Sequence, residues 1–204
     1  MLAAVLALAI GYWLSDYLLV KHPKLSGIHA TVLGEPRDVQ SFTLIDQTGK
    51  KFDNHSLQGR WSFVFFGYTH CPDVCPTTLS VLNSVAYKLE GPENQVQFVF
   101  ISIDPERDTP EKLGQFVSSF NSTFIGATGT DETINTLTHQ LGVVYTRAQE
   151  TSGSDNSGKD NYLMDHSASV LLFDPAGRFH AVFTPPLNAT DMASDFELIS
   201  KSYR

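Results

Sequence analysis

Cysteine is almost absent from this chain, since only Cys71 and Cys75 occur among 204 residues. A disulfide-stapled scaffold needs more cysteines at wider spacing, so the fold must depend on its hydrophobic core. Positive charge is also scarce, with 14 basic residues against 22 acidic ones and a net charge of −8. Nucleic acid is therefore not expected as a partner, because phosphate binding needs clustered Lys and Arg. The two thiols are better suited to chemistry than to architecture.

The N-terminus has no basic residue before Lys21, and residues 2–14 are apolar and uncharged. A cleaved signal peptide would want basic residues before its apolar core and a small-residue cleavage site after it. Extended to residue 20, the run covers about 28 Å as a helix, close to the roughly 30 Å hydrocarbon core of a bilayer. We therefore expect residues 1–20 to form an uncleaved membrane anchor, with a cleaved signal peptide or a buried helix as alternatives.

Residues 21–38 contain two prolines and two glycines without clear periodicity, which is typical of a linker. The folded domain is then expected over residues 39–204. At 42% hydrophobic residues, the chain is too apolar for disorder to be its main state. The length suits one domain of ordinary size.

The expected domain alternates strands with helices. A hairpin is predicted at residues 40–52, and two continuous apolar runs at residues 61–68 and 96–103 are typical of strands buried on both faces. Apolar residues spaced by three and four predict a helix over residues 76–89. Further helices are predicted from residue 109, over residues 131–141 and over residues 191–202. Further strands are predicted over residues 124–127, 143–148, 167–174 and 178–184. This order predicts a three-layer α/β fold that begins with a hairpin.

The cysteines belong to the sequence CPDVCP at residues 71–76, between a buried strand and a helix N-terminus. The amide donors and the dipole of a helix N-terminus favour an anion, so a thiolate should form there more easily than in a free peptide. Residues four apart on a helical turn lie close enough for a disulfide or for a shared soft metal ion. Two inert thiols or a small structural disulfide are the alternative. Two thiolates are an incomplete metal site, so a third ligand is expected.

Two of the seven histidines are candidates for that ligand. His166 follows a long polar loop and precedes a strand. His70 ranks second, because its ring must point away if the adjacent Cys71 turns into the site. Met164 would share a face with His166 in an extended segment, and its thioether could bind copper or fill a gap in the core.

Three segments carry a resemblance to a known family. Residues 66–79 (FGYTHCPDVCPTTL) resemble the signature of the Sco/SenC family. Residues 101–110 (ISIDPERDTP) resemble its second motif, and residues 162–167 (YLMDHS) its third, with Met where the family often has Val. The three motifs occur in the family's order and span essentially all of residues 39–204.

The resemblance implies a thioredoxin-like fold that binds copper, as Cu(I) and Cu(II), and helps metallate cytochrome c oxidase. Carried over by motif, the metal ligands would be Cys71, Cys75 and His166. Asp104 would lie near the thiols and tune them, and Asp165 would orient His166. The expected partners are the copper-bearing subunit of the oxidase and other copper chaperones or thiol reductants. The resemblance also implies a membrane tether with the domain outside the cytoplasm, on the periplasmic side of a bacterial inner membrane.

Three functions from different classes remain open at this point. A copper metallochaperone is a carrier rather than an enzyme. A thiol–disulfide reductase would use the redox-active pair Cys71 and Cys75 to keep the recipient's cysteines reduced, without any need for His166. A peroxiredoxin-like peroxidase shares the fold class but wants a different context around its attacking cysteine.

Overall fold

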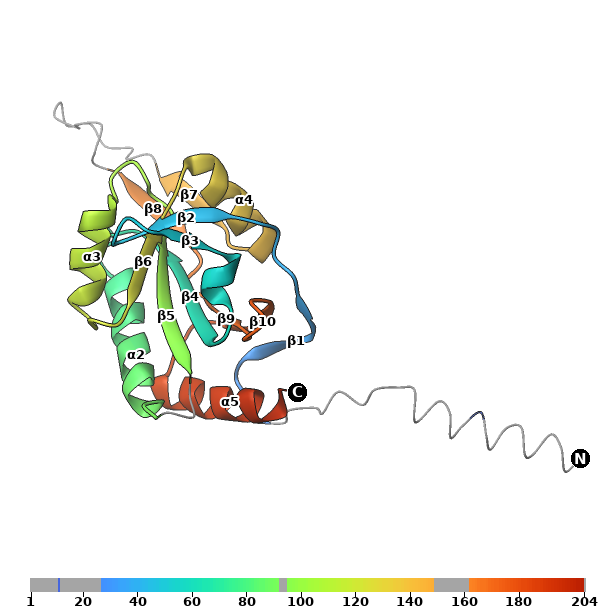
Figure 1. The fold of residues 1–204 in the computed structure, drawn as a ribbon. Helices are drawn as coiled ribbons and strands as arrows, with labels where there is room; N and C mark the ends of the chain where they lie inside the picture. Colours follow the sequence, from blue (N-terminus) through green and yellow to red (C-terminus); the bar gives the residue numbers. More distant parts are fainter. Residues whose placement is uncertain (1–10, 12–26, 92–94, 149–161, 204) are drawn as a thin grey trace, which may run out of the picture.

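The computed structural model describes residue 11 and residues 27–91, 95–148 and 162–203 (Figure 1). Its main feature is an eight-stranded mixed sheet with β4, β5 and β6 parallel at its centre. From edge to edge the order is β1 (Thr31–Arg37), β10 (Phe179–Phe183), β9 (Val170–Phe173), β4 (Trp61–Gly67), β5 (Val96–Ser102), β6 (Ile125–Thr128), β2 (Thr43–Asp46) and β3 (Lys51–Asp53). A separate ribbon consists of β7 (Tyr145–Ala148) and β8 (Leu163–His166).

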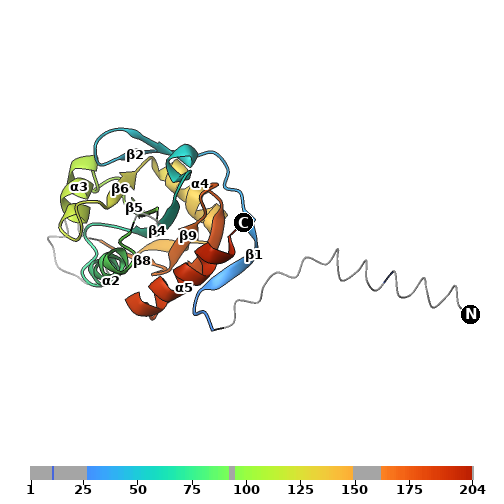
Figure 2. The same cartoon turned by 60° about the horizontal axis from the view of Figure 1, so that its bottom comes forward.

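The helices cover both faces of this sheet. They are η1 (Asn54–Leu57, a 3₁₀ helix), α2 (Val74–Lys88), α3 (Pro110–Ser118), α4 (Asp131–Leu141) and α5 (Ala189–Ser202). Figure 2 shows α2, α3 and α5 along one face and α4 on the other. The expected three-layer arrangement is therefore present.

Aromatic side chains fill the layer between the sheet and the first group of helices. The ring of Phe63 in β4 lies 5.5 Å from that of Phe196 in α5. The ring of Phe100 in β5 lies 5.4 Å from that of Phe116 in α3. All seven residues of β4 are buried, which agrees with a strand covered on both faces. These packed strands form the rigid support on which the cysteine motif stands.

The local signals in the sequence explain the helix ends. Thr109 caps α3 by accepting a hydrogen bond from the Lys112 amide, and Pro110 occupies its first position. Helix α4 spans the predicted residues 131–141 and ends at Gly142, whose φ of +69° suits glycine. Helix α2 begins at Val74, two residues before the predicted start. This earlier start places Cys75 inside the first helical turn.

The prediction of a linker over residues 21–38 is wrong for the second half of that range. Residues 31–37 form β1, which pairs with β10 at the edge of the sheet. Just before it, the amides of His29 and Ala30 donate to the buried carboxylate of Asp195 in α5, at 2.7 and 2.8 Å. The folded part of the chain therefore begins about ten residues before residue 39. An edge strand tolerates the proline and glycine that made this segment resemble a linker.

The expected membrane anchor, residues 1–20, lies outside the described residues except for Gly11. Among the helices that the structure does describe, none has the length and apolar character needed to cross a membrane.

Candidate metal centre

The two cysteines lie where β4 passes into α2. Cys71 is in the connecting turn, where its amide donates to the Tyr68 carbonyl at 3.3 Å. The Cys75 amide, in the first turn of α2, donates to the Cys71 sulfur at 3.4 Å. The turn passes close over the end of β4, because a Cβ on Gly67 would lie only 2.6 Å from the Cys75 sulfur. Glycine at position 67 thus makes room for the thiol.

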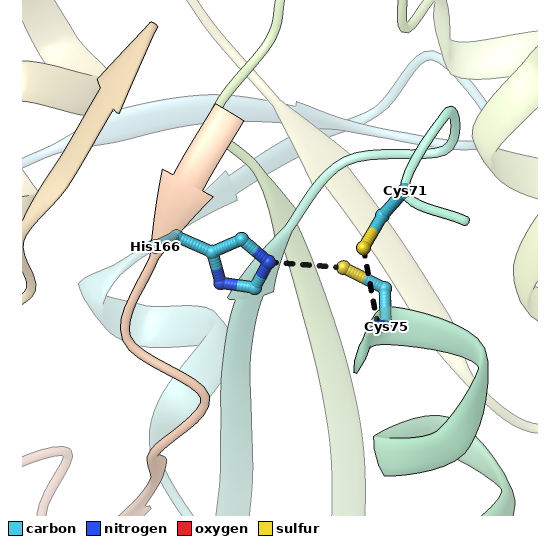
Figure 3. A group of neighbouring side chains, drawn as sticks. All are labelled: Cys71, Cys75 and His166. Carbon is cyan, nitrogen blue, oxygen red and sulfur yellow. Dashed lines mark hydrogen bonds between the residues drawn. The ribbon is translucent and has the colours of Figure 1, made fainter. Parts of the chain in front are cut away.

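His166 completes a three-residue cluster from the end of β8 (Figure 3). Its Nε2 lies 3.2 Å from the Cys75 sulfur. The ligand atoms of Cys71, Cys75 and His166 all lie within 4.8 Å of one another, so they could hold one metal ion. The Nδ1 atom lies 3.2 Å from the Ser167 carbonyl oxygen, which accepts only if Nδ1 carries the proton. That tautomer directs the free lone pair of Nε2 toward the thiols.

Burial controls protonation in this cluster. Cys75 is fully buried and Cys71 is 8% exposed. Burial raises the pKa of the Cys75 thiol, and the neighbouring Cys71 and Asp108 raise it further. Burial also lowers the pKa of His166, which keeps the imidazole neutral near pH 7. The expected easy formation of a thiolate therefore does not hold for Cys75, because burial outweighs the helix terminus. Two thiols and a neutral imidazole form a site that a soft cation can enter by displacing protons.

A buried carboxylate that the sequence analysis did not single out supports the cysteine loop. Asp108 is fully buried and accepts hydrogen bonds from the amide and hydroxyl of Thr69, at 2.9 and 2.5 Å. The Ser102 hydroxyl at the end of β5 donates to it at 2.6 Å. Asp108 thereby joins the turn before Cys71 to the centre of the sheet. Both Asp104 and Asp108 fall in the DPERD segment, and nothing in its spacing tells which one supports the cysteine loop.

Asp104 has a different set of partners from the one expected. Its carboxylate accepts hydrogen bonds from Arg107 Nε and the Tyr162 hydroxyl, each at 2.5 Å. Burial, followed by the Asp104 hydrogen bond, raises the pKa of Tyr162 to about 12. The charge of Asp108 is among the causes that raise the pKa of Cys75. An influence of Asp104 on the thiols stays a prediction.

The role expected of Asp165 is taken by a backbone group. Consecutive residues of a strand point to opposite faces, so Asp165 is exposed where His166 faces the thiols. The Ser167 carbonyl holds the imidazole, and Asp165 acts on it only through its charge, which favours the protonated ring. Met164 shares the inward face with His166 and is buried. His70 is exposed and contacts the Thr69 hydroxyl at 3.1 Å, so its ring points away from the cluster as expected.

Comparison with known proteins assigns this arrangement to a family. The sequence pattern that describes SCO1/SenC matches residues 31–200. The chain belongs to the SCO1/SenC family. A SCO2-like protein of Rickettsia prowazekii is 36% identical over 156 residues, which cover 76% of this chain and 74% of the relative. A protein of Stutzerimonas stutzeri named as a putative copper-binding protein is 34% identical over 185 residues, or 90% and 87% of the two chains.

Solved structures agree with the SCO1/SenC assignment. Arabidopsis thaliana ScoI, crystallised with copper bound, superposes with a TM-score of 0.71 at 32% identity. The superposition covers 79% of this chain and 97% of the ScoI chain. The thioredoxin-like α/β fold implied by the resemblance is thereby confirmed.

Proposed function

We propose that this protein is a copper metallochaperone. It binds one copper ion through Cys71, Cys75 and His166 and passes the ion to the copper-bearing subunit of cytochrome c oxidase. The observation that carries the proposal is the convergence of two thiols and one imidazole within 4.8 Å. A relative named for copper binding, and a structural neighbour crystallised with copper, support the choice of metal. The recipient follows from the role that the family resemblance implies.

The donor set explains why the site would hold copper and also give it up. Thiolates are soft ligands that suit Cu(I), and an imidazole adds affinity for Cu(II). Three protein ligands leave a coordination position for a ligand of the recipient. Burial raises the pKa of the Cys75 thiol, and this thiol must lose its proton on binding, so the affinity depends on pH.

Copper titration of the reduced protein tests the proposal. The wild type should bind one equivalent of Cu(I), and Cu(II) should give a sulfur-to-copper charge-transfer absorption. Cys71→Ser or Cys75→Ser should abolish stable binding, because the remaining thiolate and imidazole cannot compete with ordinary chelators. His166→Ala should weaken Cu(II) more than Cu(I), since Cu(I) tolerates two sulfur ligands. His70→Ala is the matched control, because its ring lies outside the cluster.

Two outcomes would contradict the proposal. If His166→Ala leaves Cu(II) binding and its spectrum unchanged, the imidazole is not a ligand. If the loaded protein fails to transfer copper to the reduced copper domain of an oxidase subunit, while binding copper itself, the role as a donor is wrong.

A dithiol function is the second candidate, and the contact between the two cysteines favours it. Both thiols are free, and the Cys71 sulfur accepts a hydrogen bond from the Cys75 amide. In such a reaction the two thiols are oxidised to one disulfide while the recipient's disulfide takes up two electrons and two protons. His166→Ala separates the candidates, because it should leave the reduction of a recipient disulfide intact while weakening Cu(II) binding.

We also propose that residues 1–20 anchor the domain outside the cytoplasm, on the periplasmic side of a bacterial inner membrane. The long apolar run at residues 2–14 supports this location. Full-length protein should stay with membranes through a carbonate wash, and removal of residues 1–24 should release it. An intact full-length chain in the wash supernatant would refute the anchor.

A further inference from the structure

The three residues of the metal centre come from two separately built parts of the protein. Cys71 and Cys75 follow β4, which belongs to the large sheet, whereas His166 ends β8 of the ribbon. Within the described residues, β7 and β8 pair with each other and not with the large sheet. The backbone returns to the large sheet only at Val170, where β9 pairs with Phe65 of β4, so His166 is tied to the sheet on its C-terminal side. On the N-terminal side of His166, side-chain contacts hold the ribbon against the domain.

Three alternate residues of the ribbon segment face the body of the domain. His166 faces the Cys75 sulfur. Met164, two residues earlier, is buried, and its amide donates to the Tyr68 hydroxyl at 3.1 Å. Tyr162, two residues earlier again, is 9% exposed and begins the inward-facing series. In an extended strand its Cα lies about 13 Å from that of His166, at roughly 3.3 Å per residue.

Tyr162 contacts the body of the domain through its hydroxyl, its carbonyl and its ring. Its hydroxyl donates to Asp104, and its carbonyl accepts from Arg107 at 3.0 Å. The Arg107 guanidinium lies 3.5 Å from the centre of the Tyr162 ring, and that of Arg147 lies 4.0 Å from it. Arg107 is itself fixed by Asp104. We call Asp104, Arg107 and Tyr162 the tyrosine clamp.

The clamp links the ribbon to the turn after β5. Asp104 and Arg107 lie in that turn, whose Asp108 supports the cysteine loop through Thr69. The same short segment thus contacts both parts of the metal centre. A second, outer contact joins Arg147 of β7 to Glu106 at 2.9 Å, but both side chains are about half exposed and contribute less.

We propose that Tyr162 is a positioning residue, which holds the ribbon so that His166 faces Cys75 and supplies the third ligand. The consequence for metal binding rests on the proposed function. The positioning itself concerns the metal-free protein and can be tested without copper. With the clamp released, Cys71 keeps its place in the turn after β4 and Cys75 its place in α2, whereas the imidazole is held less firmly.

Tyr162→Phe tests the positioning because it removes the hydroxyl and keeps the ring. Hydrogen exchange of the reduced, metal-free protein is read at the Met164 and Ser167 amides, which bond Tyr68 and Val144. A hydrogen bond to a charged group contributes about 1.5–3 kcal/mol, so exchange at these amides should quicken by about tenfold or more. Amides of α5 should exchange as in the wild type. Tyr87→Phe is the control, since Tyr87 on α2 is 63% exposed.

The second part of the experiment measures how the loosened imidazole changes the affinity for copper. Tyr162→Phe should weaken Cu(II) binding about 10- to 100-fold, the usual effect of removing a residue that orients a metal ligand. The affinity for Cu(I) should stay near that of the wild type, because two thiolates are sufficient ligands for Cu(I). Asp104→Asn should repeat both effects in weaker form.

The outcomes separate this inference from the proposed function. Unchanged exchange at Met164 and Ser167 in Tyr162→Phe would overturn the positioning role, whatever copper does. Faster exchange with unchanged Cu(II) affinity would also overturn it, because the ribbon would then move without affecting the ligand. Faster exchange in a protein whose wild type binds no copper would refute the proposed function and leave the positioning of His166 in place.

Discussion

Gly67→Ala should damage the metal centre more than it damages the fold. The added methyl group would lie 2.6 Å from the Cys75 sulfur and 2.8 Å from Cε2 of Phe100. Ordinary contacts between such atoms lie near 3.5–4.0 Å, so the methyl group intrudes by about 1 Å on each neighbour. Both neighbours are buried and packed, with Cys75 fully enclosed and Phe100 1% exposed.

The size of both effects follows from this geometry. Overpacking of a filled core costs about 1–3 kcal/mol, and the unfolding free energy of Gly67→Ala should fall by that amount. The clash with the added methyl group is relieved most easily if the Cys75 side chain turns away, because the Phe100 ring is held between strand and helix. A metal site needs its ligands within about 0.5 Å of their places, so a sulfur displaced by about 1 Å should lower Cu(I) affinity strongly.

Two measurements on the same samples test the expectation. Urea unfolding of the reduced, metal-free protein gives the stability, and a Cu(I) competition titration gives the affinity. Gly126→Ala is a matched control from the same sheet, since its methyl group would meet Leu113 at 3.1 Å and Val117 at 3.3 Å, away from the thiols. The control should lose some stability and keep its copper affinity. A Gly67→Ala protein with wild-type stability and wild-type copper affinity would refute the reasoning.

Three further predictions concern charge and protonation. The ammonium of Lys51 is the main cause that lowers the pKa of Asp53 from 3.8 to about 2. The folded state thus has the lower pKa, so the carboxylate stabilises the fold above about pH 4 and this contribution is lost as the pH falls toward 2. Asp53→Asn should therefore reduce the unfolding free energy at pH 6 and have much less effect at pH 2, as measured by urea titration. Because burial keeps Cys75 protonated, Cu(I) binding at pH 7 should release its proton. The calorimetric enthalpy should then vary with the ionisation enthalpy of the buffer, and a constant enthalpy would contradict the prediction. Asp195→Ala should lower stability by about 1–3 kcal/mol, because the part-buried amide of His29 and the buried amide of Ala30 lose their acceptor. Protection of these two amides from exchange should disappear in the same variant.

The sequence contained enough information for the parts of the fold that local patterns determine. Nearly continuous apolar runs marked β4 and β5, because strands buried on both faces leave few positions for polar residues. Helix α4 could be placed to the residue, since a threonine cap and a glycine stop bound it. Strand β1 was not predicted, because its side chains are partly exposed and its partner, β10, lies about 145 residues later in the chain.

The residues of the site could be predicted from the sequence, whereas the pKa shifts and the supporting carboxylate could not. The three motifs named Cys71, Cys75 and His166, and the structure brings these three together. Which carboxylate supports the cysteine loop depends on the course of the turn after β5, and spacing alone could not distinguish Asp108 from Asp104. The raised pKa of Cys75 likewise depends on its complete burial beneath the turn. A helix N-terminus alone would have suggested the opposite shift.

The unequal exposure of the two sulfurs sets an order of events for thiol exchange. Cys71 keeps 8% of its surface exposed, whereas Cys75 has none. In the thiol–disulfide function proposed above, a disulfide on another molecule would therefore meet Cys71 first. Cys71 would form a mixed disulfide with one of its sulfurs, and the other sulfur would leave as a thiolate. Cys75 can attack that adduct only after losing a proton that burial holds in place. In that function, release of the other molecule would therefore depend on ionisation of the buried Cys75 thiol.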